Sequence, residues 1–135
     1  MSLMSFLSLL SPSTSAELEN KSVNFGEQSR HKTLILDLDE TLIQSRPLIN
    51  GMNDFVEGDG KFIIEIGETK MQFEISTRPH VMRVIEELSQ MYEIAVFTAA
   101  EQDYATAILE KLDPDQHLFD RTNKLLHRSH CIKRD

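Results

Sequence analysis

The sequence predicts an α/β fold built on a parallel sheet. Two short apolar runs, at residues 32–36 and 93–97, contain β-branched residues and have the length of buried strands. Segments whose apolar residues recur at helical spacing lie at 79–92 and 101–112. The order strand–helix–strand–helix is typical of a parallel sheet with right-handed crossovers.

Composition indicates a globular domain of ordinary polarity. The chain has 135 residues, of which 40% are hydrophobic and 27% charged, enough for one domain with a core. Residues 1–30 are rich in Ser, Asn and Glu and show no sustained period, so we expect a disordered tail before a domain at 31–135. No apolar run has the length needed to span a bilayer, and the start lacks the basic region of a secretory signal.

Charge and cysteine usage exclude several classes of function. The formal net charge is −8, whereas nucleic-acid binding favours a basic surface, so no direct nucleic-acid binding is expected. Cys131 is the only cysteine, which excludes an internal disulfide and favours a reducing compartment. We therefore expect an intracellular protein, nuclear or cytoplasmic.

The first strand is followed by a predicted loop and a predicted β-hairpin. The strand at 32–36 is expected to be buried on both faces of the sheet. The stretch 45–60 carries several Pro and Gly residues and is predicted as loop. Apolar residues then alternate in 61–66 and again in 71–76, around a turn that contains Gly. Because this hairpin is inserted before the first helix, we expect it to stand over the site as a flap.

Two helices are predicted after the hairpin. Pro79 suits the first turn of the first helix, because its missing N–H is harmless there. The second helix, at 101–112, is expected to end at Asp113 and Pro114. Residues 119–132 are predicted to hold one or two short strands. The residues expected to face the core are Val81, Ile85, Leu88 and Tyr92 in the first helix and Tyr104, Ile108, Leu109 and Leu112 in the second.

Two aspartates directly follow the first strand. If that strand ends at Leu36, Asp37 and Asp39 can both project into the crevice at the carboxyl end of the sheet. Adjacent carboxylates repel one another, so a cation or a shared proton must relieve the pair. Mg²⁺ suits oxygen ligands of this kind, and we expect Asp37 and Asp39 to be metal ligands. In phosphoryl transfer, Asp37 could be the nucleophile and Asp39 the proton donor.

A second polar segment follows the second strand. The hydroxyl of Thr98 and the amides of Ala99 and Ala100 are expected to open onto the same crevice. These amides begin the predicted second helix, and a helix N-terminus is a ready anion site. Arg78, at the end of the hairpin, could bind a substrate phosphate. The roles needed for phosphoryl transfer thus converge from separate segments.

Simpler interpretations of these residues stay open. Asp37 and Asp39 could be solvated charges, and Thr98 could be a helix N-cap. Arg78 could be a surface arginine or the partner of an acidic residue. A calcium-binding EF-hand loop is excluded, because Leu42 stands where that loop needs Gly.

Other polar residues near the C-terminus carry weaker predictions. His127, His130 and Cys131 fit no standard zinc spacing, so a structural role is predicted for them. The basic residues of this region are too sparse for a nucleic-acid patch: Lys124, Arg128, Lys133 and Arg134.

Several segments together resemble a known family. The run LILDLDETL at 34–42 resembles the first motif of the haloacid dehalogenase superfamily. The segments TRPHV at 77–81, YEIAVFTAA at 92–100, LDP at 112–114 and HC at 130–131 then follow in order. The ordered set resembles the RNA polymerase II C-terminal-domain phosphatases, which include the small CTD phosphatases and the Dullard group.

The resemblance implies a fold and a reaction. The fold is a Rossmann-like parallel sheet with helices on both faces and an inserted β-hairpin. The reaction is Mg²⁺-dependent removal of phosphate from phosphoserine or phosphothreonine in a protein substrate. Asp37 would form an aspartyl-phosphate intermediate, and Asp39 would be the acid/base. The expected phosphate-binding residues are Thr41, Thr98, Ala99 and Arg78.

The chain also departs from the family pattern. A third motif with a lysine and a fourth, acidic motif lie beyond the His-Cys segment in the family, and this chain ends at Asp135 before either. Lys133 lies too early to be that lysine. We therefore expect a domain that is incomplete at its C-terminus, with an open sheet edge and impaired activity.

Two other functions share part of this pattern. A non-catalytic phosphopeptide- or partner-binding module of the same fold would not need the missing motifs. A glycosyltransferase also uses two aspartates near a strand end to hold a metal–nucleotide. The continuation from Glu40 to Leu42 and the Arg78-Pro79 and Phe97-Thr98 segments argue against the glycosyltransferase.

Overall fold

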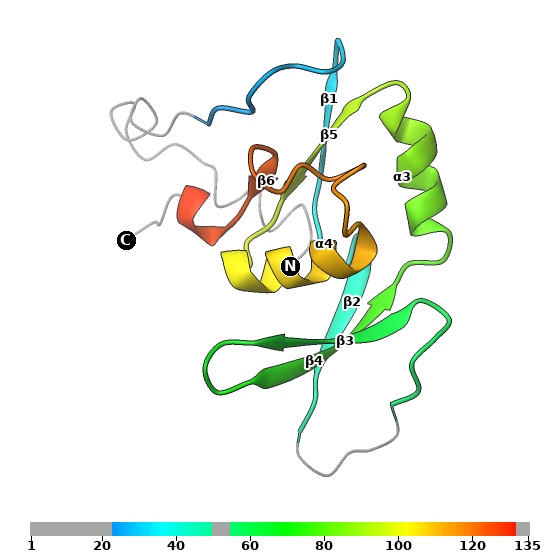
Figure 1. Ribbon diagram of the computed structural model, residues 1–135, viewed down its shortest axis with the longest axis vertical. Coiled ribbons are helices and arrows are strands. Elements are labelled where there is room, and N and C mark those ends of the chain that lie inside the picture. The colour runs from blue at the N-terminus through cyan, green and yellow to red at the C-terminus, as the bar shows by residue number, and fades with distance from the viewer. Residues whose placement is uncertain (1–22, 50–54, 132–135) are drawn as a thin grey trace.

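The chain folds as two small sheets that share one core. The computed structural model describes residues 23–49 and 55–131. A parallel sheet has the order β1-β5-β6, and an antiparallel sheet has the order β2-β4-β3, as Figure 1 shows. The strands are β1 Thr33–Leu36, β2 Ile43–Pro47, β3 Lys61–Ile66, β4 Met71–Thr77, β5 Glu93–Phe97 and β6 Leu125–Leu126.

The parallel sheet is the one that the sequence predicts, with one difference in burial. Leu36 of β1 pairs with Val96 of β5, and Phe97 of β5 pairs with Leu126 of β6. The middle strand β5 is buried as expected, but Ile35 of β1 is 50% exposed, so the prediction that β1 is buried on both faces is wrong. Among the described residues β1 pairs with β5 alone.

The predicted hairpin is confirmed in position and register. Ile66 at the end of β3 pairs with Met71 at the start of β4, around the turn of residues 67–70. The amide of Lys70 donates to the carbonyl of Gly67 at 3.1 Å, and Gly67 itself has a φ of +72°, which favours glycine. The hairpin is not isolated, because β2 pairs antiparallel with β4 on its other side.

The strand β2 corrects the prediction that residues 45–60 are loop. Ile43 to Pro47 pair antiparallel with β4, with Ile43 opposite Thr77. A proline is tolerated here because β2 lies at the edge of its sheet, where one side needs no amide donor. Residues 50–54 of the predicted loop lie outside the described residues.

Burial in the middle strand β4 differs from simple alternation. Glu74 is only 8% exposed, although the sequence pattern assigns it to the polar face. Arg46 on the neighbouring strand β2 pairs with its carboxylate at 2.9 Å. The ion pair satisfies a carboxylate that the neighbouring strands enclose.

The helices are α3, Val81–Ser89, and α4, Gln102–Leu112. Pro79 lies before α3 rather than in its first turn, because His80 is the N-cap and has a left-handed φ of 63°. The second helix has the predicted extent, with Glu101 as its N-cap. No helix in the described ranges is long and apolar enough to cross a membrane.

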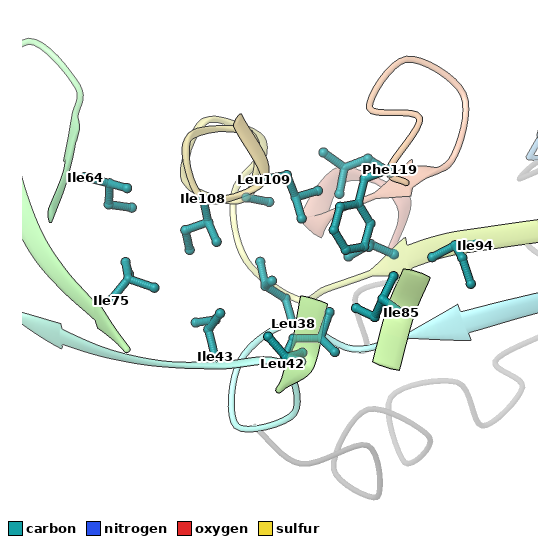
Figure 2. Packing of buried hydrophobic residues seen from close by; sticks show 14 residues of the cluster. Leu38, Leu42, Ile43, Ile64, Ile75, Ile85, Ile94, Ile108, Leu109 and Phe119 are labelled. Carbon is teal, nitrogen blue, oxygen red and sulfur yellow. The ribbon is translucent and has the colours of Figure 1, made fainter. Parts of the chain in front are cut away.

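One hydrophobic cluster joins the two sheets and both helices. Figure 2 shows Ile64 and Ile75 of the antiparallel sheet, Ile108 and Leu109 of α4, and Ile94 of β5 within it. Leu38, which follows β1, lies in the middle of this cluster in Figure 2 and has no exposed surface. The core therefore holds the segment after β1 against both sheets. The predicted core residues Val81, Ile85, Ile108 and Leu109 are buried, whereas Leu88, Tyr92, Tyr104 and Leu112 are partly buried against the cluster.

Part of the predicted tail contacts the sheet. Residues 1–22 lie outside the described residues. The amide of Ser29 donates to the carboxylate of Glu93 at 2.8 Å, and the ammonium group of Lys124 lies 3.8 Å from that carboxylate. Burial acts to raise the pKa of Glu93, but these hydrogen bonds and the Lys124 charge lower it overall. The segment before β1 is thus attached to the start of β5.

A buried carboxylate ends α4 and positions the next turn. Asp113 is the C-cap of α4, at the position where the sequence predicts the helix to stop. Its two carboxylate oxygens accept the amides of His117, Leu118 and Phe119 at 3.0, 2.7 and 2.9 Å. Burial acts to raise the pKa of Asp113, but the three hydrogen bonds outweigh it and lower the pKa. The carboxylate thereby places Phe119, which is 2% exposed, in the core.

We predict that Asp113→Asn lowers the free energy of unfolding at pH 7 by about 1–3 kcal/mol, because an amide cannot accept three amide hydrogens. A carboxyl whose pKa is lowered by folding stabilises the fold above its ordinary pKa of about 4, and the benefit is lost as the pH falls through the folded-state pKa. Urea unfolding between pH 7 and pH 3 measures this. Asp115→Asn, at a residue whose side chain is 81% exposed, is the control. Equal losses in the two variants would contradict the prediction.

Candidate active site

The parallel strands bring two polar segments to one edge of the sheet. Leu36 and Val96 are paired neighbours, so the chain after β1 and the chain after β5 leave the sheet side by side. The first segment begins with Asp37 and the second includes Thr98. This is the carboxyl end of the sheet, where open α/β sheets bind ligands.

The chain turns sharply after Asp37. The carbonyl of Leu38 accepts the amides of Leu42 and Ile43 at 2.9 and 3.2 Å, and the amide of Glu40 donates to Ile43 at 2.8 Å. Glu40 has a left-handed φ of 60°, a conformation that costs energy for a residue with a side chain and that often marks functional turns. The strand therefore ends at Leu36, as the placement of both aspartates at the site requires.

Asp37 is a buried carboxyl group whose pKa lies above its ordinary value. It is 7% exposed, and the amide of Leu38 donates to its Oδ1 at 2.7 Å. Burial raises its pKa, the Leu38 hydrogen bond lowers it, and the charge of Asp39 raises it again, so that the pKa lies above its ordinary value. The ionised form is thus destabilised in a way that an adjacent cation would relieve.

Asp39 lies at the rim of an open cavity. The cavity has a volume of about 540 Å³ and is lined by Asp39, the hairpin residues Ile66, Met71 and Phe73, and Tyr104 of α4. The predicted flap thus does border the site. Its lining is largely apolar, in contrast to the two carboxylates.

Tyr104 connects α4 to Asp39. Its hydroxyl donates to Oδ1 of Asp39 at 2.7 Å, and its ring packs edge-on against Phe73 with the ring centroids 5.5 Å apart. Burial and then the hydrogen bond to Asp39 raise the pKa of Tyr104, so the hydroxyl keeps its hydrogen. Helical spacing predicted Tyr104 as a core residue only. The hint that the sequence contained was a tyrosine, whose hydroxyl usually finds a partner when its ring is buried.

Thr98 is buried directly after β5 and does not lie at the start of a helix. It is 1% exposed, its amide donates to Leu126, and its Oγ1 accepts the amide of Ala100 at 3.2 Å. Because α4 begins at Gln102, the expectation that the amides of Ala99 and Ala100 begin the helix is wrong, and Thr98 is not its N-cap. Within the described residues no acceptor receives the amide of Ala99.

Arg128 supports the turn before α4. Its amide donates to Ala100, its Nε donates to Ala99, and its Nη1 pairs with Glu101, each at 2.9 Å. From the sequence, Arg128 was expected only as part of a sparse basic end. In the structure it fixes the segment after Thr98.

Arg78 holds the turn after Asp39. Its Nε donates to the carbonyl of Thr41 at 2.7 Å and its amide donates to Leu42 at 2.9 Å. Both Thr41 and Arg78 line a smaller cavity of about 290 Å³. The guanidinium group is exposed and contacts backbone carbonyls, so it lies beside the aspartate turn from the end of β4.

The histidines near the C-terminus belong to local structure. His127 is buried, and its amide donates to Nδ1 of His130 at 3.0 Å. Burial and the neighbouring His130 lower the pKa of His127. No group of three His, Cys, Asp or Glu side chains that could hold a metal ion occurs in residues 23–49 and 55–131. Lys133 and Arg134 lie outside the described residues.

The donor atoms at the site suit a magnesium ion better than a transition metal. Mg²⁺ is commonly bound through one or two carboxylates and keeps several waters. Asp37 supplies a carboxylate whose pKa is raised by burial and by a second acid, and this group gains most from a nearby cation. The chemistry of the oxygen donors therefore fits the ion that the sequence predicts.

The sequence of this chain is similar to those of known phosphatases. A family model described as NLI interacting factor-like phosphatase matches residues 32–135. CTD nuclear envelope phosphatase 1 of Xenopus tropicalis is 36% identical over 112 residues, covering 77% of this chain and 43% of that protein. The homologue from Drosophila melanogaster is 35% identical over 105 residues, covering 76% of this chain and 42% of that protein. This chain thus spans about two fifths of the length of these relatives.

Two less similar proteins are also phosphatases by name. A human phosphatase of the RNA polymerase II C-terminal domain is 30% identical over 105 residues, covering 78% of this chain and 10% of that protein. Among solved structures, that of Fcp1, an essential RNA polymerase II CTD phosphatase, matches with a TM-score of 0.58 and 22% identity. The match covers 73% of this chain and 30% of that chain, and it shows a shared fold.

We predict that Asp37→Asn raises the free energy of unfolding at pH 7 by about 0.5–2 kcal/mol in the presence of a chelator. The amide oxygen of Asn can still accept the Leu38 amide, while the buried charge and its repulsion of Asp39 are removed. Because folding raises the pKa of Asp37, the advantage is fully present above the folded-state pKa and disappears as the pH falls and the carboxyl becomes protonated. Urea unfolding of wild type and variant measures it.

Glu68→Gln, in the exposed turn of the hairpin, removes one negative charge and serves as the matched control. A variant at Asp37 that is less stable than wild type would show instead that the fold gains from the ionised carboxylate.

Proposed function

The chain belongs to the family of NLI interacting factor-like phosphatases, and from this premise we propose that it removes phosphate from phosphoserine or phosphothreonine in a protein. The observation that supports this best is the pair of aspartates at the carboxyl end of β1. One is buried and under electrostatic stress, and the other is hydrogen-bonded at the rim of an open cavity. The two aspartates thereby have different surroundings, and because a nucleophile must be ionised, the raised pKa of Asp37 makes a nearby cation part of this proposal.

The first step is transfer of the phosphoryl group to the enzyme. A carboxylate oxygen of Asp37 attacks phosphorus while the bond from phosphorus to the seryl or threonyl oxygen breaks. Asp39 donates its proton to that leaving oxygen, so the alcohol departs neutral. The product is an aspartyl phosphate on Asp37 and an ionised Asp39.

The second step returns the enzyme to its starting state. Asp39 takes a proton from a water molecule, whose oxygen attacks phosphorus. The bond between phosphorus and the Asp37 oxygen breaks, and inorganic phosphate leaves. Mg²⁺, held by the Asp37 carboxylate and the main-chain carbonyl of Asp39, would supply positive charge against the phosphate oxygens.

The remaining candidate residues bind phosphate in this proposal. The amide of Ala99 and the hydroxyl of Thr98 supply donors from the chain after β5, and Thr41 and Arg78 supply donors from the turn after Asp39 and the end of β4. Support for Ala99 comes from its amide, which no acceptor in the part of the chain that the structure describes receives, whereas the neighbouring Ala100 amide donates to Thr98. Arg78 supports the site in any case, since it holds the Thr41 carbonyl.

The substrate and its location are part of the same proposal. Relatives carry the names of a nuclear envelope phosphatase and of an RNA polymerase II C-terminal domain phosphatase. We infer a phosphorylated protein as partner and a nuclear or cytoplasmic site of action. The apolar cavity beside Asp39 suits a peptide rather than a highly charged small phosphate ester.

We predict that the 135-residue chain releases phosphate from a phosphoserine or phosphothreonine peptide in the presence of Mg²⁺. Asp37→Asn should reduce this rate by about a thousandfold or more, because the nucleophile is lost. A chelator should abolish it, and Mg²⁺ should restore it. Phosphate release measured over time with a colorimetric assay gives the result, with Glu68→Gln as the control variant.

Phosphate release that Asp37→Asn leaves intact would contradict the proposal. Tight binding of the phosphopeptide without any release would assign the chain to the non-catalytic binding modules of this fold.

A further inference from the structure

Tyr104 is held firmly enough to orient another side chain. It lies in α4, whose neighbouring residues Ala105 and Ile108 have no exposed surface. Its ring meets Phe73 of β4 at an interplanar angle of 80°, so the hairpin fixes it from the second side. A tyrosine that is positioned by a helix and a sheet together has little freedom to move its hydroxyl.

The hydroxyl of Tyr104 distinguishes the two oxygens of Asp39. It donates to Oδ1 at 2.7 Å, a short hydrogen bond typical of a hydroxyl and a carboxylate. With Oδ1 occupied by this hydrogen bond, Oδ2 is the oxygen of Asp39 that is left to face a substrate. The orientation of the carboxyl group is thereby defined, and not only its position.

Resting on the function proposed above, we propose that Tyr104 is a positioning residue, which holds Oδ1 of Asp39 so that Oδ2 carries the proton to the leaving oxygen of the substrate. Tyr104 contacts neither of the bonds that form or break. It acts through Asp39, and the ring contact with Phe73 makes the hairpin part of this support. The hairpin that lines the cavity therefore also fixes the acid at its rim.

A positioning role for Tyr104 has a consequence that a purely structural role lacks. A seryl oxygen is a poor leaving group and needs a proton as its bond to phosphorus breaks. A p-nitrophenolate ion leaves without one. Loss of proton-donor orientation should therefore slow the reaction of a phosphoserine peptide and spare that of p-nitrophenyl phosphate.

The test compares Tyr104→Phe with wild type in single-turnover reactions of the 135-residue chain with Mg²⁺, with enzyme in saturating excess. We expect a loss of about tenfold or more in the rate constant for the phosphoserine peptide, and less than about threefold for p-nitrophenyl phosphate. In an Asp39→Asn background the same change should cost nothing further for the peptide, since the group it orients is absent. Tyr92→Phe removes the same atom from the only other tyrosine and is the matched control.

Each other outcome is decisive. Equal losses with both substrates would assign Tyr104 to general support of the fold and overturn the proposal, as would the absence of any loss. A further loss in the Asp39→Asn background would also overturn it, because Tyr104 would then act independently of Asp39. A wild-type chain that reacts with neither substrate would refute the proposed phosphatase function itself, and this inference with it.

Discussion

The site depends on a leucine anchored between two aspartates. Leu38 has no exposed surface, and its carbonyl accepts amides from the turn that follows it. The core therefore fixes the chain between Asp37 and Asp39, and both acids stay at the carboxyl edge of the sheet whatever their mutual repulsion. Burial first, and then the charge of Asp39, hold the pKa of Asp37 above its ordinary value, although the Leu38 amide lowers it. Burial of this kind is how folds maintain reactive carboxylates, at some expense of stability.

The antiparallel sheet extends this constraint to the cavity. It shares the hydrophobic cluster with the parallel sheet, so the hairpin cannot move independently without exposing Ile64 and Ile75. Through Phe73 it also contacts Tyr104, which binds Asp39. The element that shapes the apolar lining of the cavity is thus mechanically linked to one of the two carboxylates. Under the proposed function, substrate recognition and acid/base chemistry would rest on the same few packed side chains.

Local sequence patterns predicted those elements that local physics controls. The hairpin, the middle strand and the second helix follow from alternation, apolar runs and capping, and each was found where expected. Three errors involve partners from distant sequence. The sequence pattern predicts Pro47 as loop. In the structure it is part of a strand, because β2 lies at the edge of its sheet and the missing N–H is harmless there. Alternation predicts an exposed Glu74, but Arg46 of the adjacent strand pairs with its carboxylate, and the apolar run predicts a buried Ile35, which no element of the described chain covers fully.

For the candidate site, the sequence by itself determined where the groups of the proposed chemistry stand along the chain. It ended the first strand at Leu36, spaced two carboxylates one residue apart, and placed Thr98 after the neighbouring strand. Only the tertiary structure decided what those groups touch: Tyr104, 65 residues from Asp39, and Arg78, 37 residues from Thr41. The physical reason is range, because backbone preferences act over a few residues. A hydrogen bond between residues far apart in the sequence forms only after the packing of helices and sheets has brought its donor and acceptor within hydrogen-bonding distance.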